Sequence, residues 1–283
     1  MPVAVVTDST AYLPAELLPA YRLTVVPLTV VLNGVEGLEG VDTSPADATQ
    51  ALTARRVSVS TSRPAPEQFA RTYRDLLAAG AEGVVSVHLS AGLSGTVEAA
   101  QLAAARFDGR VSVVDSRSCG MGLGFPAIAA ARAAAHGADL AGVRDAAVAA
   151  VGRTTIFFYV DTLEFLRRGG RINAAEALLG TALSVKPILY MPDGGIVLRD
   201  KVRTASRGVA RLVDLAVEAA GDAQVDVAVH HLAAPRRAED LLGALTARLG
   251  DRLHDAYVSE AGAAVAAHAG PGLACIVTHR HPA

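Results

Sequence analysis

Short apolar runs alternate with longer stretches of helical periodicity in the first half of the chain. The runs Val3–Thr7, Val57–Ser60, Val84–Leu89 and Val111–Val114 are rich in valine, and each is followed by serine, threonine or aspartate. Short buried strands that alternate with helices are typical of a parallel, doubly wound sheet. We therefore expect such a sheet, with a ligand site at the carboxyl ends of its strands.

Proline and glycine mark where several elements begin or turn. Helices are expected to open at Pro14 and at Pro64 or Pro66, because proline fits the first helical position. Leu23–Leu32 is rich in β-forming residues, and Asn33-Gly34 directly after it predicts a hairpin.

The pattern changes near residue 154. Thr155–Val160 is the most apolar and aromatic strand candidate, and strands and helices continue to alternate after it. We expect two α/β lobes, residues 1–154 and 155–283, with the ligand between them. The helices expected in the second lobe span residues 163–168, 174–179, 205–220 and 236–249, and the strands span 184–190, 196–203, 225–230, a segment near Tyr257 and 274–277.

The composition is that of a globular protein without a membrane span. Apolar residues make up 51% of the 283 residues, whereas disorder requires low hydrophobicity and high charge. Charged residues interrupt the alanine-rich stretch Pro126–Val151, which predicts a pair of helices because a membrane span needs about 20 mostly apolar residues. With no visible signal peptide and no disulfide spacing between the two cysteines, we expect a cytoplasmic protein.

The charge balance argues against a nucleic-acid partner. Lysine and arginine number 26 against 28 acidic residues, a net charge of −2. Nucleic-acid binding requires an excess of positive charge, and base stacking requires aromatic residues, which make up only 4% of the chain.

Hydroxylated residues gather where two of the expected strands lead into helices. Thr61 and Ser62 follow one strand, and Ser94, Gly95 and Thr96 stand at the start of another helix. Backbone N–H groups at a helix N-terminus attract anions, so the two segments together favour a bound carboxylate or phosphate. For Ser94 alone, an N-cap and a hydrolase nucleophile are the alternatives. The hydrolase pattern G-x-S-x-G is incomplete, because Thr96 takes the place of its last glycine.

Cofactor and metal motifs are also incomplete. The glycines of Gly120–Gly124 follow a strand, but the dinucleotide-binding pattern requires a glycine where Phe125 stands. Neither His230-His231 nor His279-Arg280-His281 belongs to a zinc-binding motif. We therefore expect no cofactor and no metal.

Three arginines cluster at the end of a short expected helix. Arg167, Arg168 and Arg171 surround Gly169-Gly170. Such a cluster is either a solvated helix end, where cations favour the helix dipole, or a docking patch for an acidic partner or an anionic surface.

In this order, the motifs resemble those of the DegV family of bacterial fatty-acid-binding proteins over essentially the whole chain. Each motif alone is short, but their joint pattern is specific. The matching segments are Val5–Thr10 with Leu13-Pro14, Val59–Ser62 with Pro64, Leu89–Thr96, Val113–Ser116, Leu163–Ile172, Val185–Pro187, Lys201–Thr204 and His268–Gly272.

The resemblance implies a protein that holds one long-chain fatty acid between two lobes. The residues that hold the carboxylate in the family correspond to Thr61 and Ser94, and the family's histidine near the headgroup corresponds to His268. The expected ligand-binding set is Thr61, Ser62, Ser94, Gly95, Thr96 and His268.

The acyl chain needs an apolar tunnel, for which the second lobe offers candidates. The tunnel candidates are Phe157, Tyr159, Leu163, Ile188 and Tyr190.

Arg63 stands where many relatives have a neutral residue, and it either alters the charge near the headgroup or points to solvent.

The resemblance also implies a partner. Members of the family present the fatty acid to a separate fatty-acid kinase, and the acyl phosphate then feeds phospholipid synthesis. The chain has no visible ATP-binding motif, so we expect a carrier and not an enzyme. Arg167, Arg171 and Arg203 resemble residues that face the kinase or a membrane surface. The alternatives are a serine hydrolase or acyltransferase using Ser94, and a carrier of another small anionic metabolite.

Overall fold

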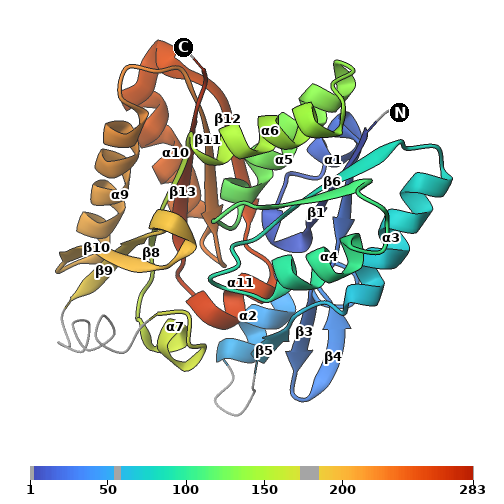
Figure 1. Ribbon diagram of the computed structural model, residues 1–283. Helices are drawn as coiled ribbons and strands as arrows, with labels where there is room; N and C mark the ends of the chain where they lie inside the picture. The colour runs from blue at the N-terminus through green and yellow to red at the C-terminus, as the bar shows by residue number, and fades with distance from the viewer. Residues whose placement is uncertain (1–2, 54–58, 173–184, 283) are drawn as a thin grey trace.

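The computed structural model describes residues 3–53, 59–172 and 185–282, and its strands form three sheets (Figure 1). A four-stranded and a three-stranded sheet contain the strands that precede residue 116, and a six-stranded sheet contains those that follow residue 153. The expected α/β fold class, with a parallel sheet and a second lobe of sheet and helices, is confirmed.

The four-stranded sheet is parallel throughout and has the order β2-β1-β6-β7. The chain adds β2 on one side of β1 and later adds β6 on the other, so the strand order reverses between β1 and β6. Ligands of open α/β sheets bind at the carboxyl ends of the strands beside such a reversal. The strands are β1 (Val3–Asp8), β2 (Leu23–Val26), β6 (Gly83–His88) and β7 (Val111–Asp115).

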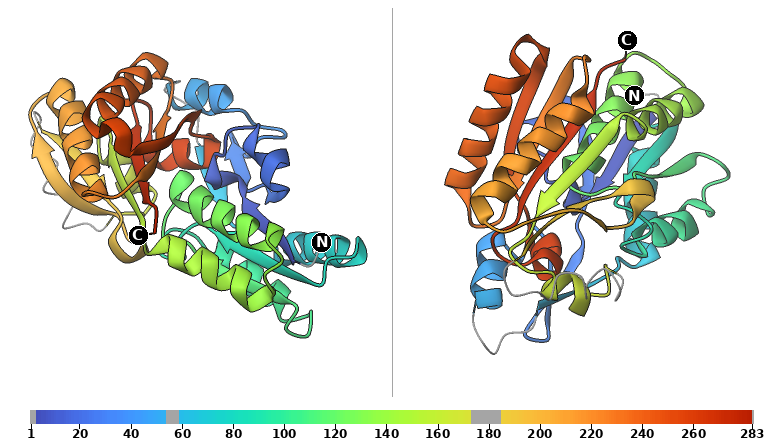
Figure 2. Two further views of the ribbon diagram at one scale, coloured as in Figure 1. Left: turned by 90° about the horizontal axis from the view of Figure 1, so that it is seen from above. Right: turned by 90° about the vertical axis from the view of Figure 1, so that its left-hand side faces the viewer.

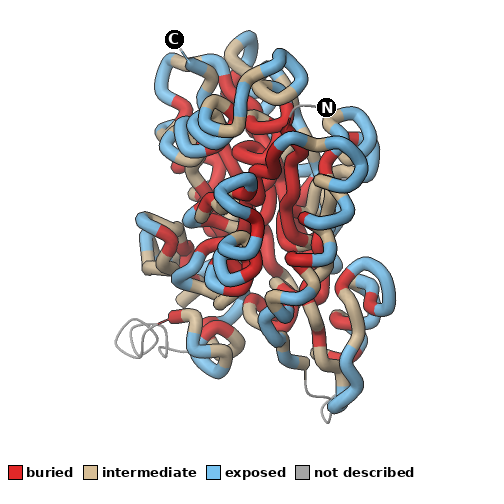
Figure 3. The backbone as a smooth tube through the Cα atoms, turned by 45° about the vertical axis from the view of Figure 1, so that its right-hand side comes forward, coloured by how far each residue is buried: buried red, intermediate tan, exposed pale blue. Residues whose placement is uncertain are grey.

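Helices cover both faces of this sheet, as a doubly wound fold requires (Figure 2). α3 and α4 pack on one face, and α5 and α6 pack on the other. Every residue of β1 and β6 is therefore buried (Figure 3). The first helix begins at Leu17 and not at the predicted Pro14. The helices are α1 (Leu17–Tyr21), α3 (Pro66–Ala78), α4 (Thr96–Ala104), α5 (Met121–Ala135) and α6 (Leu140–Val151).

The three-stranded sheet contains the predicted hairpin and one correction. β3 (Thr29–Leu32) and β4 (Val35–Leu38) are joined by Asn33 and Gly34, whose φ angles of 53° and 80° suit a tight hairpin turn. β5 (Val59–Ser62) pairs antiparallel with β3 and does not join the parallel sheet. Thr61 and Ser62 therefore lie within a strand of this small sheet, not after a parallel strand. The helix α2 spans Pro45–Thr53.

The six-stranded sheet has the order β10-β9-β8-β13-β11-β12, and only β11 and β12 pair in parallel. α9 and α10 cover one face, and the other face packs toward α5, which lies between the two larger sheets. The helix predicted at residues 174–179 lies outside the described residues. The elements are β8 (Thr154–Tyr159), β9 (Lys186–Tyr190), β10 (Val197–Val202), β11 (Val225–His231), β12 (Leu253–Glu260), β13 (Ala274–Arg280), α9 (Ala205–Ala220) and α10 (Pro235–Leu249).

The longest described helix is α9, with 16 residues. None of the described helices is both long enough and apolar enough to cross a membrane.

Two short helices of the second half of the chain lie beside the small sheet. α11 (Ala263–Ala269) packs against α2, β5 and α7 (Glu164–Arg168). α11 ends at Gly270, whose φ of 74° and ψ of 171° are accessible essentially to glycine alone. A Cβ atom at this position would lie 2.3 Å from the ring of Phe165 in α7. This glycine therefore sets how closely the two helices approach.

Replacing Gly270 with alanine tests this packing. We expect Gly270→Ala to lower the free energy of unfolding by about 2–5 kcal/mol, because the strained backbone and the contact with Phe165 both destabilise the fold. Gly243→Ala in α10 is the matched control, since a Cβ there meets no atom within 4 Å, and it should stabilise the protein by about 1 kcal/mol. Urea unfolding measures both, and equal midpoints for Gly270→Ala and the parent would contradict the packing.

Candidate functional site

A cavity lies where the strand order of the parallel sheet reverses. Thr10 and Leu89, which follow β1 and β6, line one side, and Ile156 and Phe158 of β8 line the side formed by the six-stranded sheet. The space between the atoms is about 890 Å³ including the opening to solvent. The cavity therefore lies between the two larger sheets.

Most of the cavity wall is apolar. The lining residues come from the loops after β1, β2, β6 and β7, from the loop between β9 and β10, from β5, β8, β11 and β13, and from α7 and α11. A wall of this kind suits a hydrocarbon chain. Its larger apolar residues are Leu28, Leu89, Leu93, Ile156, Phe158, Leu166, Met191, Ile196, Val265 and Leu273.

The tunnel candidates named from the sequence do not line this cavity. Successive side chains of a strand point to opposite faces, so Phe157 and Tyr159 pack under α9 while Ile156 and Phe158 face the cavity. Ile188 belongs to the same cluster under α9, and the partly buried Tyr190 packs against it. Leu163 is buried in the central core and is not part of the cavity wall.

One end of the cavity is polar, and two segments far apart in the sequence form it. Thr61 is presented by β5 and His268 by α11, which pack against each other. Thr61 Oγ1 and His268 Nε2 are 2.8 Å apart and share a hydrogen bond. Ser62 and Ser94 also line the cavity, so the structure brings four of the six expected ligand-binding residues together.

His268 is held neutral at physiological pH. Burial, and then the nearby Arg171 guanidinium, lower the pKa of His268 to about 4. Its Nδ1 atom is buried and has no hydrogen-bond partner among the described residues. Gly169 makes this position possible, because a Cβ atom there would lie 2.4 Å from Nδ1. His268 therefore acts as a neutral hydrogen-bonding group.

Ser94 lies just before α4 but does not cap it. Gly95 occupies the N-cap position, and no side chain caps this helix. Ser94 Oγ instead forms a 2.8 Å hydrogen bond with Thr96 Oγ1. Gly95 and the buried Thr96 adjoin Ser94 in the chain but do not line the cavity themselves. The N-cap alternative for Ser94 is therefore wrong.

Arg171 is the residue whose position differs most from the sequence-based expectation. It was expected on a docking surface, but the structure places it in the cavity wall beside His268. Its Nε donates to the carbonyl of Leu93 at 3.2 Å, and another guanidinium nitrogen donates to the carbonyl of Gly169. These hydrogen bonds fix the Arg171 guanidinium at the polar end of the cavity. The glycines that neighbour Arg171 in the sequence did not indicate this position.

The other arginines lie on the surface. Arg167 is exposed and forms an ion pair with Glu164 at 2.9 Å. Arg203 is exposed directly after β10. The side chain of Arg63 is 63% exposed and pairs with Glu98, so it points to solvent and not into the polar end of the cavity.

Tyr12 and His230, which no sequence motif indicated as ligand-binding residues, complete the cavity wall near Gly120. His230 Nε2 accepts the N–H of Met121 at 2.8 Å, and burial lowers the pKa of His230 to about 4. Both ring nitrogens are engaged, because Nδ1 shares a hydrogen bond with Ser259. No sequence signal separates such a wall residue from an ordinary core histidine.

Comparisons with known proteins agree along the full chain. Residues 2–280 match the model of a family described as "Uncharacterised protein, DegV family". A DegV domain-containing protein of Streptomyces coelicolor is 52% identical over 278 residues, which are 97% of each chain. One from Mycobacterium tuberculosis is 43% identical over 273 residues, 96% of this chain and 95% of the relative.

Solved structures share the fold. A DegV family protein from Thermus thermophilus, described by its fatty acid binding, has a TM-score of 0.90 at 33% identity and covers 99% of this chain and 100% of its own. DegV of Bacillus subtilis, described as a fatty acid binding protein, has a TM-score of 0.89 at 29% identity with the same coverage. Together with the match over residues 2–280, these similarities show that the chain belongs to the DegV family.

Proposed function

We propose that this protein binds one long-chain fatty acid in the cavity, with the carboxylate at the polar end. The observation that carries the proposal is the pairing of a long apolar wall with hydroxyl groups, a neutral imidazole and a guanidinium at one end. A fatty acid has the same division into a hydrocarbon chain and one anionic group. DegV relatives of known structure that are described as fatty-acid-binding support the assignment.

The energetics favour a ligand of this kind. A chain of about 15 methylenes gains about 0.8 kcal/mol for each one buried, or about 12 kcal/mol as an upper limit. Burying a carboxylate costs several kcal/mol unless hydrogen bonds replace its water. Thr61, Ser94 and His268 can supply those bonds, and Arg171 supplies the opposite charge.

The division of labour in this proposal follows the two lobes, residues 1–154 and 155–283. The first supplies Thr61, Ser62 and Ser94, and the second supplies His268 and Arg171. Thr96 holds the Ser94 hydroxyl through a hydrogen bond, and Gly95 forms the N-cap of α4 between them. The assignment of the lobes is supported by the sheets, because no sheet of the described chain combines strands from both sides of residue 154.

The protein would act as a carrier and not as an enzyme. It would present the carboxylate to a separate fatty-acid kinase, with the acyl phosphate used in phospholipid synthesis, and the exposed Arg167 and Arg203 would contact the kinase or a membrane surface. A cytoplasmic location suits the two unpaired cysteines, Cys119 and Cys275.

A serine hydrolase using Ser94 is a weaker reading of the same site. Among the described residues, Ser94 Oγ is bonded to Thr96, and the histidine of the polar end is bonded to Thr61. A nucleophilic serine needs a base within hydrogen-bonding distance. A carrier of another small anion would use the same polar end but would leave the apolar wall without a purpose.

Extraction of the purified protein with organic solvent, followed by mass spectrometry, tests the proposal directly. We expect close to one fatty acid per chain in the extract and an unmodified intact mass for the protein. An acylated protein would favour the Ser94 enzyme, and a polar metabolite would favour the other carrier. A protein that contains no fatty acid and takes up none when it is added would rule out the proposed function.

Removing two hydroxyl groups tests the placement of the carboxylate. Thr61→Ala combined with Ser94→Ala should weaken fatty-acid binding by more than about 100-fold, because each hydrogen bond to a charged group contributes about 1.5–3 kcal/mol. Thr246→Ala with Ser206→Ala is the matched control, since both hydroxyls lie on exposed helix surfaces. Fluorescent fatty-acid displacement measures both, with circular dichroism to show folding. Equal affinity in the two folded double variants would place the carboxylate elsewhere.

The neutrality of His268 gives a prediction about pH. In the ligand-free protein, the ring should remain uncharged from pH 8 to pH 5.5, since its pKa lies near 4. Arg171→Gln should raise this pKa but leave it below 6.5, because burial remains as the larger cause. Arg167→Gln removes an exposed arginine instead and should leave it unchanged.

NMR titration of ¹³C-labelled histidine rings, assigned with His268→Gln, follows this residue. A His268 midpoint near 6.5 in the parent protein would contradict the buried, cation-adjacent position.

A further inference from the structure

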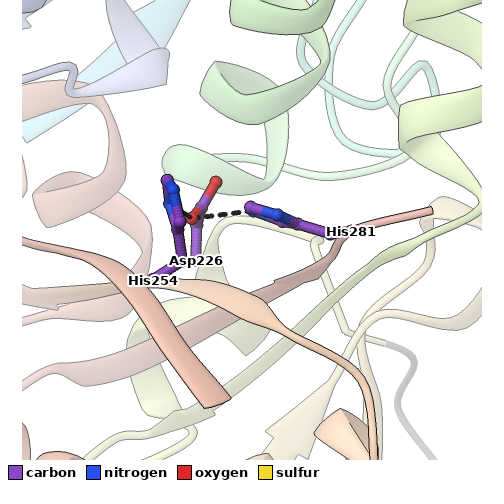
Figure 4. A group of neighbouring side chains, drawn as sticks. All are labelled: Asp226, His254 and His281. Atoms are coloured by element: carbon purple, nitrogen blue, oxygen red, sulfur yellow. Dashed lines mark hydrogen bonds and ion pairs between the residues drawn. The ribbon is translucent and has the colours of Figure 1, made fainter. Parts of the chain in front are cut away.

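Three side chains of metal-binding type meet at the end of the six-stranded sheet that is remote from the cavity (Figure 4). Asp226 lies at the start of β11, His254 at the start of β12, and His281 directly after β13. β11 and β12 run in parallel and β13 runs against β11, so these three points adjoin. His230 of the cavity lies four residues further along β11, about 13 Å away at the usual rise of a strand.

The ligand atoms are spaced as a metal ion requires. Asp226 Oδ1 lies 3.1 Å from His254 Nδ1 and 2.9 Å from His281 Nε2, and all three groups offer an atom within 4.8 Å of the others. Four ligand atoms around zinc, at bond lengths of about 2.0–2.1 Å, lie about 3.3 Å from one another. Shifts of a few tenths of an ångström bring the two measured pairs to this spacing, and the nitrogens of His254 and His281 lie within 4.8 Å of each other.

Hydrogen bonds between Asp226, His254 and His281 do not account for all the polar atoms of this cluster. Asp226 is only 3% exposed, and both rings direct a nitrogen at the same carboxylate oxygen. His281 Nε2 is buried and lies close to Asp226, yet within the described part of the chain it makes no hydrogen bond of acceptable geometry. A cation between the three groups would bind this nitrogen and balance the negative charge of the buried carboxylate.

The surroundings also suit a bound cation. Asp226 Oδ1 accepts the backbone N–H of Asp255 at 3.2 Å, and such outer hydrogen bonds commonly orient a ligating carboxylate. The Asp255 carboxylate lies 3.3 Å from His254 Nδ1 and adds negative charge. The side chain of His254 is 49% exposed, which gives an ion access from solvent. Arg132 is close enough to interact with Asp226 and acts against a cation.

We propose that Asp226, His254 and His281 bind one divalent transition-metal ion, with zinc as the ion that two imidazole nitrogens and one carboxylate oxygen fit best. Water or Asp255 would complete the coordination. The ion would fasten the end of β13 to the first residues of β11 and β12. This is a structural role that is independent of fatty-acid binding.

Zinc binding by the full-length, tag-free protein tests the proposal. After treatment with EDTA and transfer to metal-free buffer, calorimetric titration with zinc chloride should show one ion per chain. Zinc at about 100 times its Kd should raise the unfolding midpoint by roughly 5 °C. If the protein binds no zinc at about 100 µM, a concentration on the order of the Kd of weak sites, the proposal is overturned.

Two histidine variants and a control locate the ion. His254→Ala and His281→Ala should each weaken zinc binding by more than about 100-fold, since even outer partners of metal ligands are worth 10–100-fold. His254 is half exposed, so its removal should leave the fold intact. His136→Ala is the control, because His136 is exposed and its ring bonds the carbonyl of Arg132. Unchanged zinc affinity in folded His254→Ala would place the ion elsewhere and refute the site.

Discussion

The polar end of the cavity depends on one buried carboxylate, that of Glu39. It accepts hydrogen bonds from Ser9 Oγ, from Tyr12 OH at 3.1 Å and from the backbone N–H of Ala264 at 2.8 Å. Burial raises the pKa of Glu39, and these three donors act in the opposite direction. Gly262 is required beside it, because a Cβ atom there would lie 2.3 Å from Oε1. Since Ala264 is in the first turn of α11, Glu39 fixes the helix that carries His268.

A second constraint is the alanine-rich helix α5 between the two larger sheets. Ten of its 15 residues are buried, and it packs against β1 and β6 on one side and β8 and β13 on the other. Most of this helix is apolar and buried, and its glycines and alanines let the two sheets approach it closely. The many small residues of this helix therefore allow the two halves of the chain to share one core. From the sequence, its alanine-rich part had indicated only a pair of helices.

Most helices and strands could be predicted from the sequence, but not which side chains of a strand face the cavity. The period of two along β8 could not decide between its faces, because Ile156, Phe157, Phe158 and Tyr159 are all large and apolar. Thr61 and Ser94 were indicated by the hydroxylated ends of two expected strands and again by the family resemblance. Arg171 was expected to contact a partner, because its hydrogen bonds to main-chain carbonyls leave no trace in the spacing of the sequence. The expectation of no metal site considered neighbouring histidines. Ligands contributed singly by three separate strands form no motif.

The hydrogen bond between Thr61 and His268 has a consequence for turnover. A carrier of the proposed kind must stay folded both with and without its ligand. An unpaired buried polar group lowers the stability of the fold by about 1–3 kcal/mol. Because these two side chains can bond each other, departure of a carboxylate need not strand either of them. In the proposed function the two side chains exchange one hydrogen bond for another on unloading, so the transfer of the acyl chain out of the apolar cavity would dominate the free energy of that step. Retention would then scale with the length of the cargo, and the protein would sort fatty acids by residence time.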